Sequence, residues 1–329
     1  MTSPQTSTRA AVKSGNGAMG DSGRDTAEEA REHSTGLSAV ADAALWASAA
    51  LLGQLPLAAQ RRLGRLLGRI ALRLAPRRRR IAERNLELCF PDASTEARRR
   101  LLVRNFEATG MALVESATAW TRDPRTLAGR VDVIGGARLE AALAAPEGVL
   151  LLGCHLVPLE ICGAFLGLIA DVDAVQRRGG DGPLDRLRRR GRRRHFGGLV
   201  DRDDVRALIR RLRAGRCVWY AFDQDPGPDR GVFAPFFGVP AATPDAAPRI
   251  AAAAGARLLF LDHWREPGTD RWTLRFRPVP DGLPSDDAAA DTRRLVALVE
   301  DAVRAHPEQY LWTHRRFKTR PAGEAGPYD

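Results

Sequence analysis

The stretch from Gly148 to Gly167, GVLLLGCHLVPLEICGAFLG, constrains the fold of this chain more than any other. Its continuous apolar run, residues 149–152, predicts a strand that is buried on both faces. Gly153 allows the backbone to turn sharply, and Pro158 suits the first turn of a following helix. Ligands usually bind where such a strand ends. The stretch therefore predicts a strand, a turn and a helix, with a functional site at the turn.

His155 lies on the predicted turn, and Glu160 lies one helical turn further on. If the turn folds back, the Glu160 carboxylate can hydrogen-bond one ring nitrogen of His155 while the other nitrogen faces a substrate hydroxyl. A base oriented by a third group in this way activates an oxygen nucleophile. The alternative is that the two residues are near each other only in sequence, and their spacing alone does not decide. A thiol hydrolase that uses Cys154 with His155 is less favoured, because adjacent side chains usually point apart.

Charge and cysteine content narrow the classes of partner and compartment. The 329-residue chain is 44% hydrophobic, which excludes a wholly disordered protein, and its net charge of +11 comes almost entirely from arginine. Such a charge implies an anionic partner, which is nucleic acid, acidic lipid or a phosphorylated substrate. The chain has four cysteines without CxxC spacing, so a reducing compartment is favoured.

The N-terminal part changes composition twice. Residues 1–36 are polar and lack an apolar period, which predicts a disordered tail. Residues 37–60 are mostly apolar and predict a membrane-anchoring helix, with the main domain following over residues 61–329. The arginines between residues 61 and 80 favour anionic lipid headgroups and place that domain on the cytoplasmic side. A solvated amphipathic helix is the alternative.

Two further stretches carry candidate site residues. Residues 216–223 predict a buried strand that ends at Asp223, with Asp225 two residues later. Two carboxylates can bind a metal, but no further set of ligands with metal spacing follows, so we predict no metal. The run RLRRRGRRRHFGG, residues 186–198, suits phosphate binding, although most arginines of such runs face solvent. An arginine-rich nucleic-acid-binding protein is the competing class, but the run lacks interleaved aromatic residues.

The remaining patterns predict alternating helices and strands. Helices are expected from a cap at Ser94 or Thr95 to Trp120, over residues 246–254 and over residues 287–306. Strands are expected over residues 171–178 and as a pair formed by residues 258–264 and 272–279. The phenylalanines at 233, 236 and 237 lie in a long loop and either line an apolar cavity or pack the loop down. The predicted class is α/β, with a mixed central sheet flanked by helices.

Five ordered segments carry a family resemblance: ERNLELCFPD, LLGCHLVPLE, GRCVWYAFDQD, GVFAPFFGVPAAT and HPEQYLWTHRRFKTRP. Together they resemble the late acyltransferases of lipid A biosynthesis, the lauroyl and myristoyl transferases, which belong to the lysophospholipid acyltransferase superfamily. The resemblance extends from about Leu45 to Pro321, and the closing block is its most specific part. Pro226 departs from the pattern, since relatives commonly have tyrosine there.

The resemblance implies an enzyme of the cell inner membrane without a metal or organic cofactor. Its donor would be acyl carrier protein, and its acceptor a hydroxyl of a Kdo-bearing lipid A precursor. By position, His155 matches the base and Glu160 its carboxylate partner, while Arg192 and Asp223 match residues that serve the substrate. The resemblance also admits an acyltransferase of the same superfamily that acts on another membrane glycolipid or an aminolipid.

Overall fold

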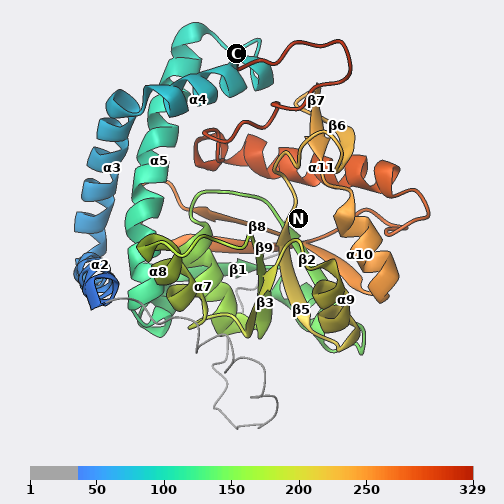
Figure 1. Cartoon of the computed structure of the whole chain (residues 1–329), viewed down its shortest axis with the longest axis horizontal. Coiled ribbons are helices and arrows are strands. Elements are labelled where there is room, and N and C mark those ends of the chain that lie inside the picture. Colours follow the sequence, from blue (N-terminus) through green and yellow to red (C-terminus); the bar gives the residue numbers. More distant parts are fainter. Residues whose placement is uncertain (1–35, 329) are drawn as a thin grey trace, which may run out of the picture.

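A seven-stranded mixed sheet forms the centre of the computed structural model, which describes residues 36–328 (Figure 1). Its strand order is β1-β9-β8-β2-β5-β3-β4. The strands are β1 (Val131–Ile134), β2 (Val149–Gly153), β3 (Val172–Gln176), β4 (Gly198–Asp201), β5 (Cys217–Ala221), β8 (Arg257–Arg265) and β9 (Trp272–Pro278). Neighbouring strands are parallel except β8 and β9, which form the predicted pair and run antiparallel. The predicted class, a mixed sheet with helices around it, is confirmed.

Helices cover both faces of this sheet (Figure 1). They are α2 (Gly36–Gln54), α3 (Leu57–Leu74), α4 (Pro76–Cys89), α5 (Thr95–Thr121), α6 (Gly136–Leu143), α7 (Leu159–Ile169), α8 (Pro183–Arg192), α9 (Val205–Arg213), α10 (Ala246–Ala254) and α11 (Ala288–Ala305), with short 3-10 turns η1 (Pro124–Arg130) and η2 (Pro307–Gln309). The side chain of Ser94 accepts the N–H of Ala97 and caps α5 as expected.

Strand β2 is buried on both faces because the sheet lies between two apolar layers. Leu150 and Leu152 point into one layer, and Val149 and Leu151 into the other. All four side chains are almost fully inaccessible. The continuous apolar run therefore predicted this central strand correctly.

The loop with three phenylalanines forms an antiparallel hairpin of β6 (Val232–Phe236) and β7 (Val239–Thr243), which the sequence did not predict. Phe236 and Phe237 are buried, and Phe236 contacts the rings of Tyr310 and Phe317. Phe233 is exposed. Of the two alternatives, the structure favours phenylalanines that pack the loop down.

The apolar N-terminal segment is bent rather than continuous. Helix α2 ends at Gln54, and α3 begins after Pro56, which has no N–H to continue the hydrogen-bond ladder. The buried side chain of Gln60 donates to the carbonyls of Gly53 and Leu55 and so satisfies the break. No single helix among residues 36–328 is long and apolar enough to cross a bilayer, whereas residues 39–54 and α3 together meet that test as a pair bent by 118°.

Helices α2 and α3 set the observed boundaries in the N-terminal part of the chain. Residues 1–35 of the predicted tail lie outside the described residues. The segment 37–60, predicted as one helix, contains α2 and the first turn of α3. Helix α3 packs closely on α5, because Gly64 and Gly68 leave room for the backbone around Gly110. The helix pair is therefore attached to the main domain through α5.

Candidate active site

The site lies at the edge of the sheet where β2 and β5 end. These neighbouring parallel strands pair Gly153 with Ala221. His155 follows β2 by two residues, and Asp223 follows β5 by two residues. Equal offsets after paired strands bring the two side chains together, although 68 residues separate them in the chain.

His155 and Asp223 form two hydrogen bonds. The backbone N–H of His155 donates to Oδ2 of Asp223 at 3.0 Å, and its ring Nδ1 lies 2.6 Å from Oδ1. Asp223 is only 2% exposed, whereas the His155 side chain is 27% exposed. No described residue hydrogen-bonds the second ring nitrogen, Nε2. An Nδ1–H that donates to the carboxylate leaves a lone pair on Nε2, which makes Nε2 the proton acceptor of the pair.

The electrostatics of Asp223 favour a permanent negative charge. Burial alone would raise the pKa of its carboxyl, but the charge of His155 and the two hydrogen bonds from His155 outweigh burial. The pKa of Asp223 is therefore lowered well below its usual range. Beside it, burial and the Asp223 carboxylate raise the pKa of Tyr310 well above its usual value, so that phenol stays neutral.

Glu160 does not take the predicted position beside His155. Its carboxylate accepts Nε and Nη2 of Arg192, the latter at 2.5 Å, and Nε1 of Trp120 at 2.8 Å. Arg192 also donates to Gln176 at 3.1 Å and is only 14% exposed. The hydrogen-bonded partner of His155 is thus Asp223, and Glu160 instead joins α7 to α5 and α8.

Asp225 has a different task from Asp223. It accepts the backbone N–H of Thr319 at 2.8 Å and its hydroxyl at 2.9 Å, while its own N–H donates to Nε2 of His314 at 3.2 Å. Asp225 therefore fixes the C-terminal segment beside the site. Within residues 36–328, no group of three or more His, Cys, Asp or Glu side chains is arranged to hold a metal ion.

The C-terminal block, residues 307–321, is hydrogen-bonded to the turn that carries His155. Leu311 N–H donates to the His155 carbonyl at 3.2 Å, and Val157 N–H donates to the Gln309 carbonyl at 2.7 Å. Two buried amides hold the same segment from the helices: Asn105 binds the carbonyls of residues 308 and 310, and Asn85 those of residues 312 and 314. These hydrogen bonds place the C-terminal block beside His155, although the two are far apart in sequence.

Other predicted alternatives fit the structure less well. Cys154 is fully buried, and burial raises the pKa of its thiol well above the usual value, which opposes a thiolate nucleophile. Several arginines of the dense run bind inside the chain: Arg186 to Asp42, Arg192 to Glu160, and Arg190 over the Trp46 ring at 3.8 Å. Guanidiniums held in this way are poorly placed to bind nucleic acid.

His263 is a buried histidine that contacts the segment carrying His155. Its Nε2 is 3.2 Å from the carbonyl of Leu156, the residue after His155. Burial lowers the pKa of His263 to about 4, although the hydrogen bond to Leu156 opposes the shift.

We expect the protein to lose stability in acid because of His263. Its pKa in the unfolded chain is about 6.5, so between pH 6.5 and 4 the unfolded state binds more protons and stability falls as the pH falls. The contribution lost by pH 5 is about 2 kcal/mol of the free energy of unfolding. Urea unfolding at pH 7.5 and pH 5 measures it. A His263→Gln variant keeps an N–H donor and should show a smaller difference; an equal difference would contradict this assignment.

The structure is an α/β protein whose mixed sheet places a hydrogen-bonded histidine–carboxylate pair at the strand ends. The chain matches the family described as bacterial lipid A biosynthesis acyltransferase over residues 30–319. It therefore belongs to the lipid A biosynthesis acyltransferase family, and it is an enzyme, an acyltransferase of lipid A biosynthesis.

Three relatives from Escherichia coli strain K12 show the extent of the similarity. The lipid A biosynthesis lauroyltransferase is 39% identical, covering 84% of this chain and 91% of that protein. The palmitoleoyltransferase is 36% identical (81% and 87% covered), and the myristoyltransferase is 33% identical (80% and 82%). A solved structure, the 1-acyl-sn-glycerophosphate acyltransferase of Thermotoga maritima, aligns with a TM-score of 0.35 at 16% identity, covering 74% of this chain and 97% of that one.

Proposed function

We propose that this enzyme transfers a fatty acyl chain from acyl carrier protein to a hydroxyl of a Kdo-bearing lipid A precursor. The observation that carries the proposal is His155: no residue between 36 and 328 hydrogen-bonds its Nε2, its side chain is 27% exposed, and its Nδ1 is 2.6 Å from a buried carboxylate. An oriented neutral imidazole is the group needed to remove a proton from an alcohol near neutral pH. The names of the relatives, which transfer lauroyl, palmitoleoyl and myristoyl groups, support a fatty acyl donor.

One base is sufficient for the proposed transfer, because the proton that it removes is returned to the leaving group. Nε2 of His155 removes the proton of the acceptor hydroxyl, and the oxygen attacks the thioester carbonyl. The tetrahedral intermediate then loses the thiolate of the carrier, which takes a proton back from the imidazolium. Asp223 stays ionised throughout and stabilises the imidazolium.

The oxyanion of the intermediate needs hydrogen-bond donors. Helix α7 begins at Leu159, four residues after His155, and the N–H groups of its first turn have no acceptor within the helix. Together with the positive end of the helix dipole, they are the donors that we assign to the oxyanion.

The faces of α3 support a position at the inner membrane, on its cytoplasmic side. One face of α3 has small residues and packs on α5 through Gly64 and Gly68. A second face carries arginines, and a third exposes Leu66, Ile70 and Leu74. A helix with exposed leucines beside arginines suits the boundary between headgroups and acyl chains of anionic lipid.

Charged residues on the face of α3 that exposes Leu66, Ile70 and Leu74, here called the leucine face, should weaken membrane binding. Burying a leucine or isoleucine side chain is worth about 1.5–3 kcal/mol. We therefore expect Leu66→Asp combined with Ile70→Asp to lower the affinity for anionic vesicles at least tenfold in a sedimentation assay. Val205→Asp, which changes an exposed apolar residue on α9, is the control. Equal binding by the α3 variant and the control would exclude this face.

Mass spectrometry of the lipid products tests donor and acceptor together. Membranes or purified precursor are incubated with the enzyme and with carrier protein loaded with chains of different length. The proposal expects a lipid A precursor heavier by one acyl ester. An amide product, or a heavier lipid of another class, would instead indicate an aminolipid or another glycolipid as acceptor.

A further inference from the structure

His314 is a second histidine beside the pair of His155 and Asp223, and the mechanism described above does not use it. It lies in the C-terminal block and is half-buried. The backbone N–H of Asp225 donates to its Nε2 at 3.2 Å. Because Nε2 accepts this hydrogen bond, the proton of the neutral ring is on Nδ1. His314 therefore presents an N–H donor, while its other ring nitrogen is already occupied.

The Nδ1–H of His314 is free and open to solvent. No residue between 36 and 328 accepts a hydrogen bond from it. It is not sealed inside the protein either, because the buried side-chain nitrogens and oxygens that lack a partner in this part of the chain belong to other residues, namely Arg79, Asn105, Arg188, Arg277 and Arg316. The Nε2 of His155 is open in the same way. Both histidines thus have one ring nitrogen that a substrate can reach.

Two links place His314 close to His155. The amide of Asp225 that holds its ring comes two residues after Asp223, and two residues of chain span at most about 7 Å. The N–H of His314 donates to the carbonyl of Leu311 at 3.0 Å, and the N–H of Leu311 donates to the carbonyl of His155 at 3.2 Å. The two histidines therefore lie at the same edge of the sheet.

The imidazole of His314 stays neutral near neutral pH. Burial lowers its pKa to about 4; the charge of Asp223 opposes this shift, and the charges of Arg316 and His155 add to it. A group that responds to the charges of both His155 and Asp223 is close to them. A neutral imidazole that donates an N–H can polarise a carbonyl oxygen and keep its proton.

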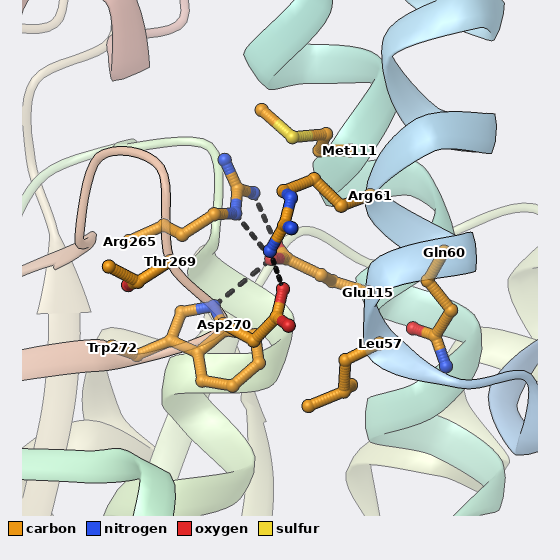
Figure 2. A pocket seen from close by; sticks show the side chains of 9 residues that line it. All are labelled: Leu57, Gln60, Arg61, Met111, Glu115, Arg265, Thr269, Asp270 and Trp272. Atoms are coloured by element: carbon orange, nitrogen blue, oxygen red, sulfur yellow. Dashed lines mark hydrogen bonds and ion pairs between the residues drawn. The ribbon is translucent and has the colours of Figure 1, made fainter.

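Hydrogen bonds fix the block that carries His314. Asn85 donates to the carbonyl of His314 at 2.7 Å. Near the start of the block, the side-chain amide of Gln309 pairs with the backbone N–H and carbonyl of Arg265, each at 2.9 Å. Figure 2 shows that the guanidinium of Arg265 in turn binds Glu115 of α5. A donor held in this way needs little reorganisation when charge develops on a substrate, as stabilisation of an oxyanion requires.

We propose that the Nδ1–H of His314 donates a hydrogen bond to the thioester carbonyl oxygen of the acyl donor as this oxygen becomes the oxyanion of the tetrahedral intermediate. It acts together with the N–H groups at the start of α7. The inference rests on the proposed function, because it concerns the intermediate of that reaction. His155 remains the base, since both nitrogens of His314 lack a free lone pair.

Two conservative substitutions separate this donor from the structural hydrogen bond of the same ring. In His314→Gln, the side-chain oxygen can reach the position of Nε2 and accept the N–H of Asp225, but no donor remains at the position of Nδ1. In His314→Asn, the shorter amide can place its NH₂ near the position of Nδ1, and the hydrogen bond to Asp225 is lost. A structural histidine tolerates glutamine better, whereas an oxyanion donor tolerates asparagine better.

We expect His314→Gln to lower kcat by about 10²-fold or more, with the KM for the lipid precursor and for loaded carrier protein nearly unchanged. His314→Asn should melt at a lower temperature than His314→Gln but keep a kcat about tenfold higher. The control is His306→Gln, which removes an imidazole that stacks on Trp264 at 4.4 Å and should change kcat less than about twofold. Rates are measured with purified enzymes, below the melting temperature of each.

The assignment is wrong if His314→Gln keeps the kcat of the wild type, or if it raises only a KM, which would make His314 a binding residue. It is also wrong if His314→Gln is more active than His314→Asn, the order that a structural role predicts. The proposed function fails separately, when the wild type transfers no chain to a lipid A precursor. The variants are then compared on the lipid that mass spectrometry shows to be acylated, and a lower kcat of His314→Gln still supports the donor.

Discussion

Replacing His155 with alanine is expected to reduce acyl transfer by about 10³-fold or more at saturating substrates. The substitution removes the only group that our mechanism gives to the acceptor proton, while Asp223 is left without its partner. A base held in position contributes a rate factor of this size because the alcohol must lose its proton as it attacks the thioester. The rate is measured with purified enzyme, lipid A precursor and loaded carrier protein.

The same variant should still bind membranes and stay folded. His155 lies at the sheet edge, far from the leucine face of α3 in sequence, and its side chain is partly exposed. Vesicle sedimentation and circular dichroism provide these controls. Activity near that of the wild type would mean that another group removes the proton, and Asp223 would be the first to test.

Local patterns predicted most of the central elements. The four apolar residues before Gly153 predicted β2, because a strand buried on both faces is apolar at every position and short runs bounded by glycine favour a strand. The small-residue stretch gave α10 with the observed bounds, Ala246–Ala254. The hairpin of β6 and β7 was missed because Pro235 and Pro240 oppose a strand assignment, and both are tolerated only because this two-stranded sheet is all edge.

The partner of the histidine depended on information that no local pattern contains. Glu160 is close to His155 in sequence, but α7 turns its side chain toward Arg192 and Trp120. Asp223 reaches His155 because β5 is the neighbour of β2, which follows from sheet order. A signal was present, since both residues directly follow buried strands, but strand adjacency was needed to use it.

Asp223→Asn should cost about 10² to 10⁴ in kcat, because asparagine no longer enforces the Nδ1–H tautomer or stabilises the imidazolium. Its neutral side chain has nearly the same shape, so the fold should be kept. Glu160→Gln should act differently. It leaves the guanidinium of Arg192, only 14% exposed, without a counter-charge, which costs roughly 3–5 kcal/mol of stability.

Glu160 is therefore expected to position α7 and α8 rather than to touch the substrate. Replacing Arg192 with methionine in the Glu160→Gln background removes the unpaired charge and should restore part of the melting temperature. A catalytic role for Glu160 would not be rescued in this way, since the double variant would still lack the carboxylate.

The most direct test measures kcat and melting temperature of Asp223→Asn and Glu160→Gln side by side, below the melting temperature of either. A catalytic pair of His155 and Asp223 predicts that Asp223→Asn loses at least ten times more kcat than Glu160→Gln while melting closer to the wild type. A folded Glu160→Gln enzyme that loses as much kcat as Asp223→Asn would contradict it.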